Sequence, residues 1–158
     1  MDSEKAHISH SVFISAEPTR VFTVITEANE WNRWFTKAST IDLRLGGHVA
    51  LKWRSWGPDR IDADDGGKIV AIEKDRRFAF EWAPTGSPTT VEFALEPQGA
   101  GTRLTVTDSG WLLNVKTIEM YMGCATGWGE ALTLIKFYVE LGATYGEVPV
   151  ASKPIERG

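Results

Sequence analysis

Three histidines and a single cysteine are the side chains of this sequence best suited to metal binding or nucleophilic chemistry, and their spacing supports neither. His7, His10 and His48 show no spacing typical of zinc ligands. Cys124, being alone, can form neither an internal disulfide nor a cysteine-built zinc site. No phosphate-binding glycine loop is present, and Ser87 does not lie in a nucleophile-elbow sequence. We therefore expect no metal, no cofactor and no catalytic triad.

Acidic residues are the next candidates. The run over residues 62–65 lacks the twelve-residue pattern and closing glutamate of a calcium loop, so we interpret it as a solvated hairpin turn. Asp108 shares strand parity with Leu104 and Val106, which aims it at the mouth of a cavity at the end of the last strand. A buried carboxylate there needs a partner such as Arg54 or a ligand donor. A solvated strand end is the favoured interpretation.

An enzyme of the cyclase or hydrolase kind is a hypothesis that these polar residues leave open. Positioning and one or two polar groups can suffice for such reactions. The candidates are His10, Asp108, Tyr121 and Arg54. They must converge on one cavity for this hypothesis to stand; otherwise His10 is a hydrogen-bonded core residue.

The chain contains seven tryptophans, and their positions suggest either a packed core or the wall of a cavity. Trp53 and Trp82 share strand parity with apolar neighbours, which points them inward, whereas Trp56 is expected in a loop at the rim. The predicted ligand-binding set combines inward strand residues, short-helix and loop aromatics and residues of the final helix: Trp34, Leu51, Trp53, Phe80, Trp82, Phe93, Val106, Asp108, Trp111 (also expected in a loop), Tyr121, Trp128 and Leu132.

Hydrophobic periodicity predicts the elements that position these residues. Residues 118–139 place apolar side chains at three- and four-residue steps, which predicts one long amphipathic helix. Residues 40–107 alternate apolar and polar side chains between turn signals, which predicts hairpin-linked strands. A first strand over 7–15 precedes Pro18, which suits a helix start, and a short aromatic helix or turn follows near 31–35. The order β-α-α-β-β-β-β-β-β-α indicates an α+β fold.

The first half of the predicted helix is unusual in its composition. Gly123, Gly127 and Gly129 each weaken it by about 1 kcal/mol relative to alanine. They permit a close approach to the sheet or a kink, and mobility there would control entry to a pocket. Met120 and Met122 would supply an adaptable wall.

Length and net charge limit the classes of protein to which this chain can belong. We expect 158 residues to form a single domain, with its core over about 8–142 and a tail over 143–158 that is loose or packed on a partner subunit. The net charge of −4 gives no basic field for nucleic acid. No segment approaches the roughly 20 apolar residues of a membrane helix, and no signal peptide is recognisable. A cytoplasmic location is therefore expected.

Several segments together resemble a known family. They are, in chain order, Val12-x-Ile14-x-Ala16-x-Pro18-x-x-Val21-Phe22, Trp31-x-x-Trp34, Gly46-Gly47 leading to Trp53, Gly67-Lys68-Ile69, residues 77–82, residues 101–107 and Gly127-Trp128-x-x-x-Leu132. The chain resembles the START-like (SRPBCC, birch-pollen-allergen-like) superfamily, and within it the family named for homology to the activator of heat-shock-protein-90 ATPase, as a small single-domain member.

The resemblance implies a helix-grip fold. In that fold a curved antiparallel sheet of about seven strands wraps a long C-terminal helix, two short helices follow the first strand, and an apolar cavity lies between sheet and helix. The eukaryotic activators also carry a chaperone-binding N-terminal domain. The first strand here is expected near residue 8, which leaves no room for it, so chaperone activation is not the expected role.

Three functions follow from this sequence. The leading one is binding of a small apolar or aromatic molecule without an assigned reaction. The alternatives are the cyclase or hydrolase described above and a chaperone-cofactor module that binds protein through an exposed apolar patch. A homodimer is compatible with each of them.

Overall fold

A single curved antiparallel sheet and one long helix form the body of the molecule. In the computed structural model, which we describe over residues 5–145, the sheet has seven strands in the order β1-β7-β6-β5-β4-β3-β2. The strands are β1 (Lys5–Ile14), β2 (Thr40–Ile41), β3 (His48–Trp56), β4 (Ile61–Glu73), β5 (Arg77–Trp82), β6 (Thr89–Gln98) and β7 (Gly101–Leu112). The helices are α1 (Pro18–Thr26), α2 (Ala28–Trp34) and α3 (Ile118–Leu141), so the predicted order and α+β class are confirmed.

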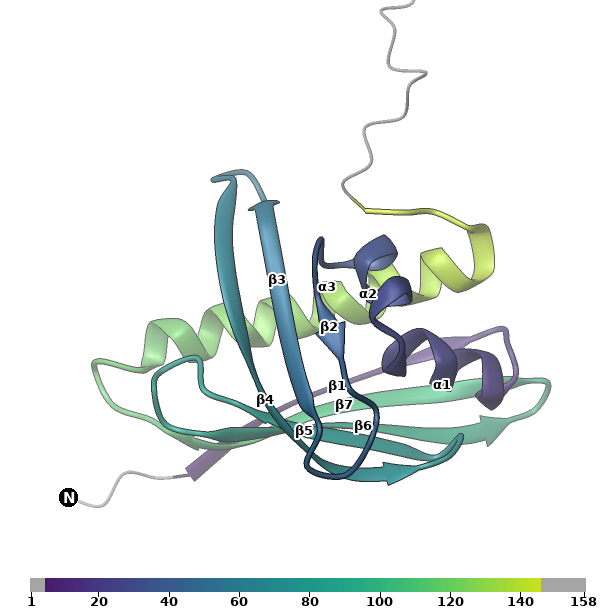
Figure 1. The fold of residues 1–158 in the computed structure, drawn as a ribbon, viewed down its shortest axis with the longest axis horizontal. Coiled ribbons are helices and arrows are strands. Elements are labelled where there is room, and N and C mark those ends of the chain that lie inside the picture. The colour runs from purple at the N-terminus through teal and green to yellow at the C-terminus, as the bar shows by residue number, and fades with distance from the viewer. Residues whose placement is uncertain (1–4, 146–158) are drawn as a thin grey trace, which may run out of the picture.

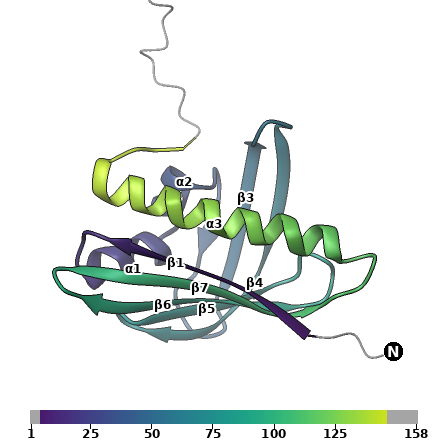
Figure 2. The same cartoon turned by 180° about the vertical axis from the view of Figure 1, so that it is seen from behind.

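The helix α3 lies across one face of the sheet (Figures 1 and 2). Its buried residues are Trp128, Ala131, Leu132, Ile135 and Tyr138, which follow the three- and four-residue steps of the sequence pattern. The helix ends at Gly142, whose left-handed φ of 70° lets its N–H and that of the next residue bond carbonyls of the last turn. The predicted long helix is confirmed, and it runs unbroken through its glycines.

The strand β4 bends where it changes partners. Residues 61–68 pair with β3 and residues 69–73 pair with β5. At the bend, a Cβ on Gly66 would lie 1.9 Å from the Val49 carbonyl oxygen, and one on Gly67 would lie 2.2 Å from that of Glu81. Only glycine permits these backbone approaches. The predicted hairpin turn over 62–65 is therefore wrong, because these residues lie within β4 and the glycine pair that follows them marks a bend inside that strand. The strands β3 and β4 rise together beside α3 (Figure 1).

The short helices α1 and α2 close one end of the sheet, beside the second half of α3 (Figure 1). The indole N–H of Trp31 donates to the Ile25 carbonyl at 2.8 Å, and that of Trp34 donates to the Val24 carbonyl at 3.1 Å. Both carbonyls lie in the last turn of α1, where intrahelical partners are missing. The two tryptophans thus link α2 to α1 by hydrogen bonds, and their rings are buried in the core.

The core continues along the inner face of the sheet. The predicted inward residues Leu51, Phe80, Phe93 and Val106 are all fully buried. Trp111, expected in a loop, lies in β7 and is buried, because that strand extends to Leu112. Trp56 is the last residue of β3 rather than part of a loop. No helix within residues 5–145 has the length and apolar character needed to cross a membrane.

Candidate functional site: an aromatic cavity under the first half of the long helix

A cavity of about 380 Å³ opens between the raised strands β3 and β4 and the first half of α3. Most of its lining side chains are aromatic, aliphatic or absent, with carboxylates only at one edge. The lining residues are Phe35, Trp53, Trp56, Ile61, Ala63, Asp64, Asp65, Trp82, Pro84, Met120, Gly123, Cys124, Gly127 and Trp128. An opening of this size and composition fits a small, largely apolar molecule.

Five aromatic rings form a continuous wall. Phe35 lies 4.7 Å from Trp56 and 5.4 Å from Trp53, measured between ring centroids. Trp53 continues the wall to Trp82 at 6.4 Å, and Trp82 continues it to Trp128 at 5.4 Å. These rings come from α2's end, two strands and α3, so the folded sheet is what assembles them.

Two positions of α3 contribute no side-chain volume to this side of the cavity. A Cβ built on Gly123 or Gly127 would meet no atom within 4 Å, so both positions leave open space. Between them, Cys124 presents a partly buried thiol. Burial raises the pKa of the Cys124 thiol to about 12, and the negative charges of Asp108 and Asp65 add to the rise. The thiol is therefore protonated and unreactive at neutral pH.

Asp108 lies behind two of the cavity indoles. Its Oδ2 accepts hydrogen bonds from the Trp82 and Trp128 indole N–H groups, both at 3.1 Å. The carboxylate is fully buried, so the expected solvated strand end is wrong, and its partners are indoles rather than Arg54. By fixing a strand tryptophan and a helix tryptophan to one oxygen, Asp108 sets the angle between two rings of the aromatic wall.

The surroundings of Asp108 contain two further polar groups. Burial raises the pKa of the Asp108 carboxyl, and the Thr89 hydroxyl and the Trp128, Trp82 and Trp111 indoles oppose that rise. Asp108 Oδ1, the Thr89 hydroxyl and the Trp111 N–H are buried without a hydrogen bond among the described residues. These two donors and one acceptor complement one another, so a small rearrangement would pair them.

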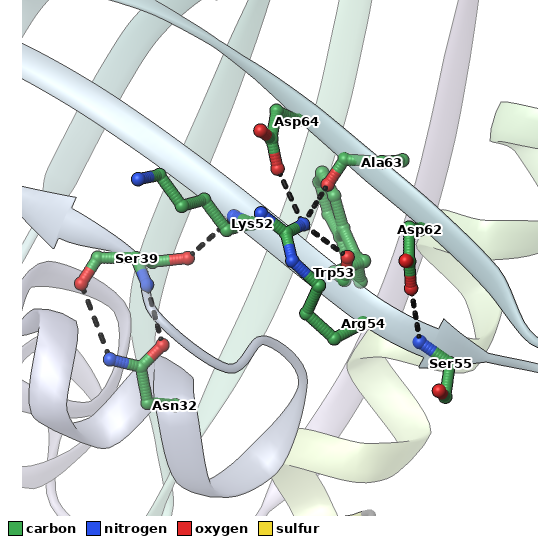
Figure 3. A network of polar contacts seen from close by, with 9 residues as sticks. All are labelled: Asn32, Ser39, Lys52, Trp53, Arg54, Ser55, Asp62, Ala63 and Asp64. Carbon is green, nitrogen blue, oxygen red and sulfur yellow. Dashed lines mark hydrogen bonds and ion pairs between the residues drawn. The ribbon is translucent and has the colours of Figure 1, made fainter.

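The edge of the cavity carries a second polar cluster, on β3 and β4. Arg54 donates to Asp64 at 2.6 Å and also to the Trp53 carbonyl (Figure 3). The hydrogen bond between Arg54 and Asp64 lowers the pKa of the Asp64 carboxyl and raises the pKa of the Arg54 guanidinium. Asp65, the next residue, points to the other face of the strand and uses Oδ1 to accept the backbone N–H of Gly66 and Ala83.

A family model describes almost this whole architecture. The model of the activator of Hsp90 ATPase homolog 1-like proteins (AHSA1) matches residues 15–140. The chain belongs to the AHSA1 family. No curated protein matches its sequence.

Solved structures of low sequence identity share the AHSA1-type fold. The solution structure of the Aha1 dimer from Colwellia psychrerythraea is 21% identical, covers 87% of this chain and 98% of its own, and has a TM-score of 0.72. Ms6760 from Mycobacterium smegmatis is 17% identical with coverage of 89% and 98% and a TM-score of 0.73. CalU16 from Micromonospora echinospora is 23% identical with coverage of 90% and 88% and a TM-score of 0.65. At these identities the likeness extends to the fold alone.

The predicted site residues of this AHSA1-family chain divide into two groups. Trp53, Trp82 and Trp128 line the cavity. The others do not line it. Asp108 holds the wall from behind and Tyr121 is half-buried against the core, whereas the rest are buried in the core: Trp34, Leu51, Phe80, Phe93, Val106, Trp111 and Leu132.

The polar residues proposed for catalysis do not meet in one cavity. His10 Nε2 donates to the Ala125 carbonyl at 2.7 Å, and the Tyr121 hydroxyl donates to the His7 carbonyl at 2.9 Å. Arg54 lies on the outer face with Asp64, and Asp108 is enclosed by indoles. Within residues 5–145, no group of three His, Cys, Asp or Glu side chains is arranged to hold a metal ion.

Several lining residues were absent from the predicted set. The sequence carries a partial signal for some of them: it predicts Trp56 at the rim, Met120 as part of an adaptable pocket wall, and mobility at the glycines of α3 that would control entry to a pocket. Phe35, Ala63 and Asp65 carried none, because their exposure to the cavity depends on the bend of β4 and on the position of α2's last residue.

Proposed function

We propose that this chain binds a small apolar or aromatic molecule in the cavity between the raised strands and the first half of α3. The observation that carries the proposal is the continuous wall of five aromatic rings facing two helical glycines that leave their side of the cavity open. Flat, polarisable rings offer a large contact area to such a ligand at little cost in side-chain entropy. Proteins with this fold commonly bind hydrophobic ligands, which agrees with the proposal.

The direct test is a titration with N-phenyl-1-naphthylamine, a neutral probe whose emission rises in apolar surroundings. We expect saturable binding to the full chain, with a matching change in tryptophan emission. Gly127→Leu would place a side chain in the open space and should weaken binding by about tenfold or more, which corresponds to about 1.4 kcal/mol.

The matched control is Thr126→Leu, which adds a leucine to the same turn of α3 at an exposed position outside the cavity lining. It should bind the probe as the unmodified chain does. Absence of probe binding to the unmodified chain, or equal affinity of the Gly127→Leu variant, would contradict the proposal.

The other functions gain no support of their own from residues 5–145. The four residues suggested for a cyclase or hydrolase are dispersed, and nothing in the geometry or the comparisons favours a chaperone-cofactor role over ligand binding. The cytoplasmic location and the single-domain organisation stay predictions. Of the tail expected over 143–158, only residues 143–145 lie within the described residues.

A homodimer is a further part of the proposal. Its support is the dimeric state of the Colwellia Aha1 protein, which shares the fold. Sedimentation velocity over a range of protein concentrations would test it, and a monomer mass throughout that range would contradict it.

A further inference from the structure

The charges around the cavity are distributed unevenly between the two faces of β4. The outer face carries Asp64, which pairs with Arg54 at 2.6 Å and is also near Lys52, so its charge is compensated. The inner face carries Asp65 opposite Leu51 in the strand pairing. Asp65 accepts two backbone N–H groups on Oδ1, whereas its Oδ2 makes no hydrogen bond to the described residues.

The charged side chains that the described residues contribute to the cavity wall are all acidic. Among the described residues that line it there is no lysine, arginine or histidine, and the charged ones are Asp64 and Asp65. Burial, followed by the charges of Asp108 and Asp65, raises the pKa of the Cys124 thiol, which lies on the opposite wall. The negative potential of Asp65 and Asp108 therefore extends across the space that a ligand would occupy.

The aromatic wall reinforces this potential. A ring presents negative charge at its face, and a cation within about 6 Å of a ring centroid is attracted to it. Trp82 and Trp128 both donate their N–H groups to Asp108. Donation to a carboxylate polarises an indole further, because linked hydrogen bonds in a low-dielectric interior strengthen one another.

From these observations we infer that the ligand of this cavity is a cationic amine carried on an apolar or aromatic body, with Asp65 as the counter-charge and the indole faces as the remaining contacts. The inference rests on the proposed function, because it assigns a chemical class to the ligand of the same cavity. An anionic ligand such as a fatty acid would meet the carboxylate of Asp65, and none of the described lining residues is a cation that could compensate it.

Calorimetry with three probes of similar shape tests the inference on the full chain at neutral pH. The probes are 1-naphthylmethylamine (cationic), 1-naphthylmethanol (neutral) and 1-naphthoate (anionic). We expect the amine to bind about tenfold tighter than the alcohol, from ring and carboxylate contacts together, and the naphthoate to bind weakest.

Asp65→Asn should abolish most of the preference for the amine while keeping the carbonyl oxygen that accepts the Gly66 and Ala83 N–H groups. The matched control is Asp62→Asn, which removes the same charge from the same strand at a residue outside the lining. It should leave the preference unchanged, and circular dichroism checks that both variants fold.

The outcomes separate the two proposals. If N-phenyl-1-naphthylamine or the alcohol binds but the amine has no advantage, or if naphthoate binds tightest, the charge inference is overturned and the apolar cavity stands. An advantage that survives Asp65→Asn overturns the role of Asp65. If no probe binds, both the proposed function and the inference fall.

Discussion

The two halves of α3 lie against the same sheet, yet one half completes a core and the other leaves a cavity. In the second half, Ala131, Leu132 and Ile135 are buried, and α1 and α2 cover this end (Figures 1 and 2). In the first half, Gly123 and Gly127 face open space and Met120 is 47% exposed.

This difference shows that side-chain size along one helix face decides where the helix–sheet interface closes. The backbone geometry of α3 is continuous across both halves. Where the residues are large, burial stabilises the fold; where they are glycines, the contact is lost and space remains. The molecule thus separates a stabilising half of the interface from a half that leaves a cavity.

The largest expected effect is on the closed half. Ile135→Ala should lower the free energy of unfolding by about 2–5 kcal/mol, because it removes a fully buried side chain from a packed site. Met120→Ala, on the open half, should cost less than about 1 kcal/mol, since Met120 is half exposed. Urea denaturation measures the free energy of unfolding of both variants. Similar decreases for the two variants would contradict the difference between the closed and the open half of α3.

Asp108 joins the sheet to the open half, and its removal should have an intermediate effect. Asp108→Ala would leave the Trp82 and Trp128 N–H groups buried without an acceptor, costing about 1–3 kcal/mol in urea denaturation. Asp108→Asn, which keeps an acceptor oxygen, should cost less. A loss below the error of the measurement for Asp108→Ala would show that the carboxylate does not hold the two tryptophans in place.

The same carboxylate predicts a pH dependence of stability. Burial raises the pKa of Asp108 in the folded state above the ordinary value of 3.8. At pH values between the unfolded-state and the folded-state pKa, the folded chain binds more protons at Asp108 than the unfolded chain does. The contribution of Asp108 to the free energy of unfolding is therefore full at low pH and declines as pH rises. The stability advantage of the unmodified chain over Asp108→Asn should therefore shrink as pH increases from about 4. An advantage that grows with pH would contradict this.

The smallest expected effect sharpens the comparison within the open half. Gly127→Ala should raise the free energy of unfolding by about 0.5–1 kcal/mol, because the added methyl meets no atom and alanine favours the helix. Gly129→Ala should raise the free energy of unfolding by less, since its methyl would lie 3.4 Å from the His10 ring. Thermal unfolding of both variants provides the measurement, and a destabilised Gly127→Ala variant would mean that the space is not open.

Most of the fold was predictable from periodicity. The strand alternation placed Leu51, Trp53, Phe80 and Trp82 inward, and the stepped apolar face of α3 predicted the buried residues of that helix. These are local properties, in which residues two or three to four positions apart share a face.

The errors arose where local pattern and long-range contact disagree. The acidic run before Gly66 resembles a turn, and only the approach of Val49 shows that the glycine serves a bend in a strand. Asp108 looked solvated because its partners, Trp82 and Trp128, come from β5 and α3, 26 and 20 residues away. Whether the interior is open or filled depends on which way two glycines face, and the sequence alone does not specify this.

The empty surroundings of Gly123 and Gly127 have a consequence for how this protein can diverge. Because neither position supports a packing contact, substitutions to Ala, Ser or Val there would change the shape of the binding space with little risk of falling below the stability that folding requires. On the proposed function, ligand selectivity would therefore change one residue at a time while the fold stays the same. Related proteins with the same backbone could then bind a different ligand without any substitution in their core.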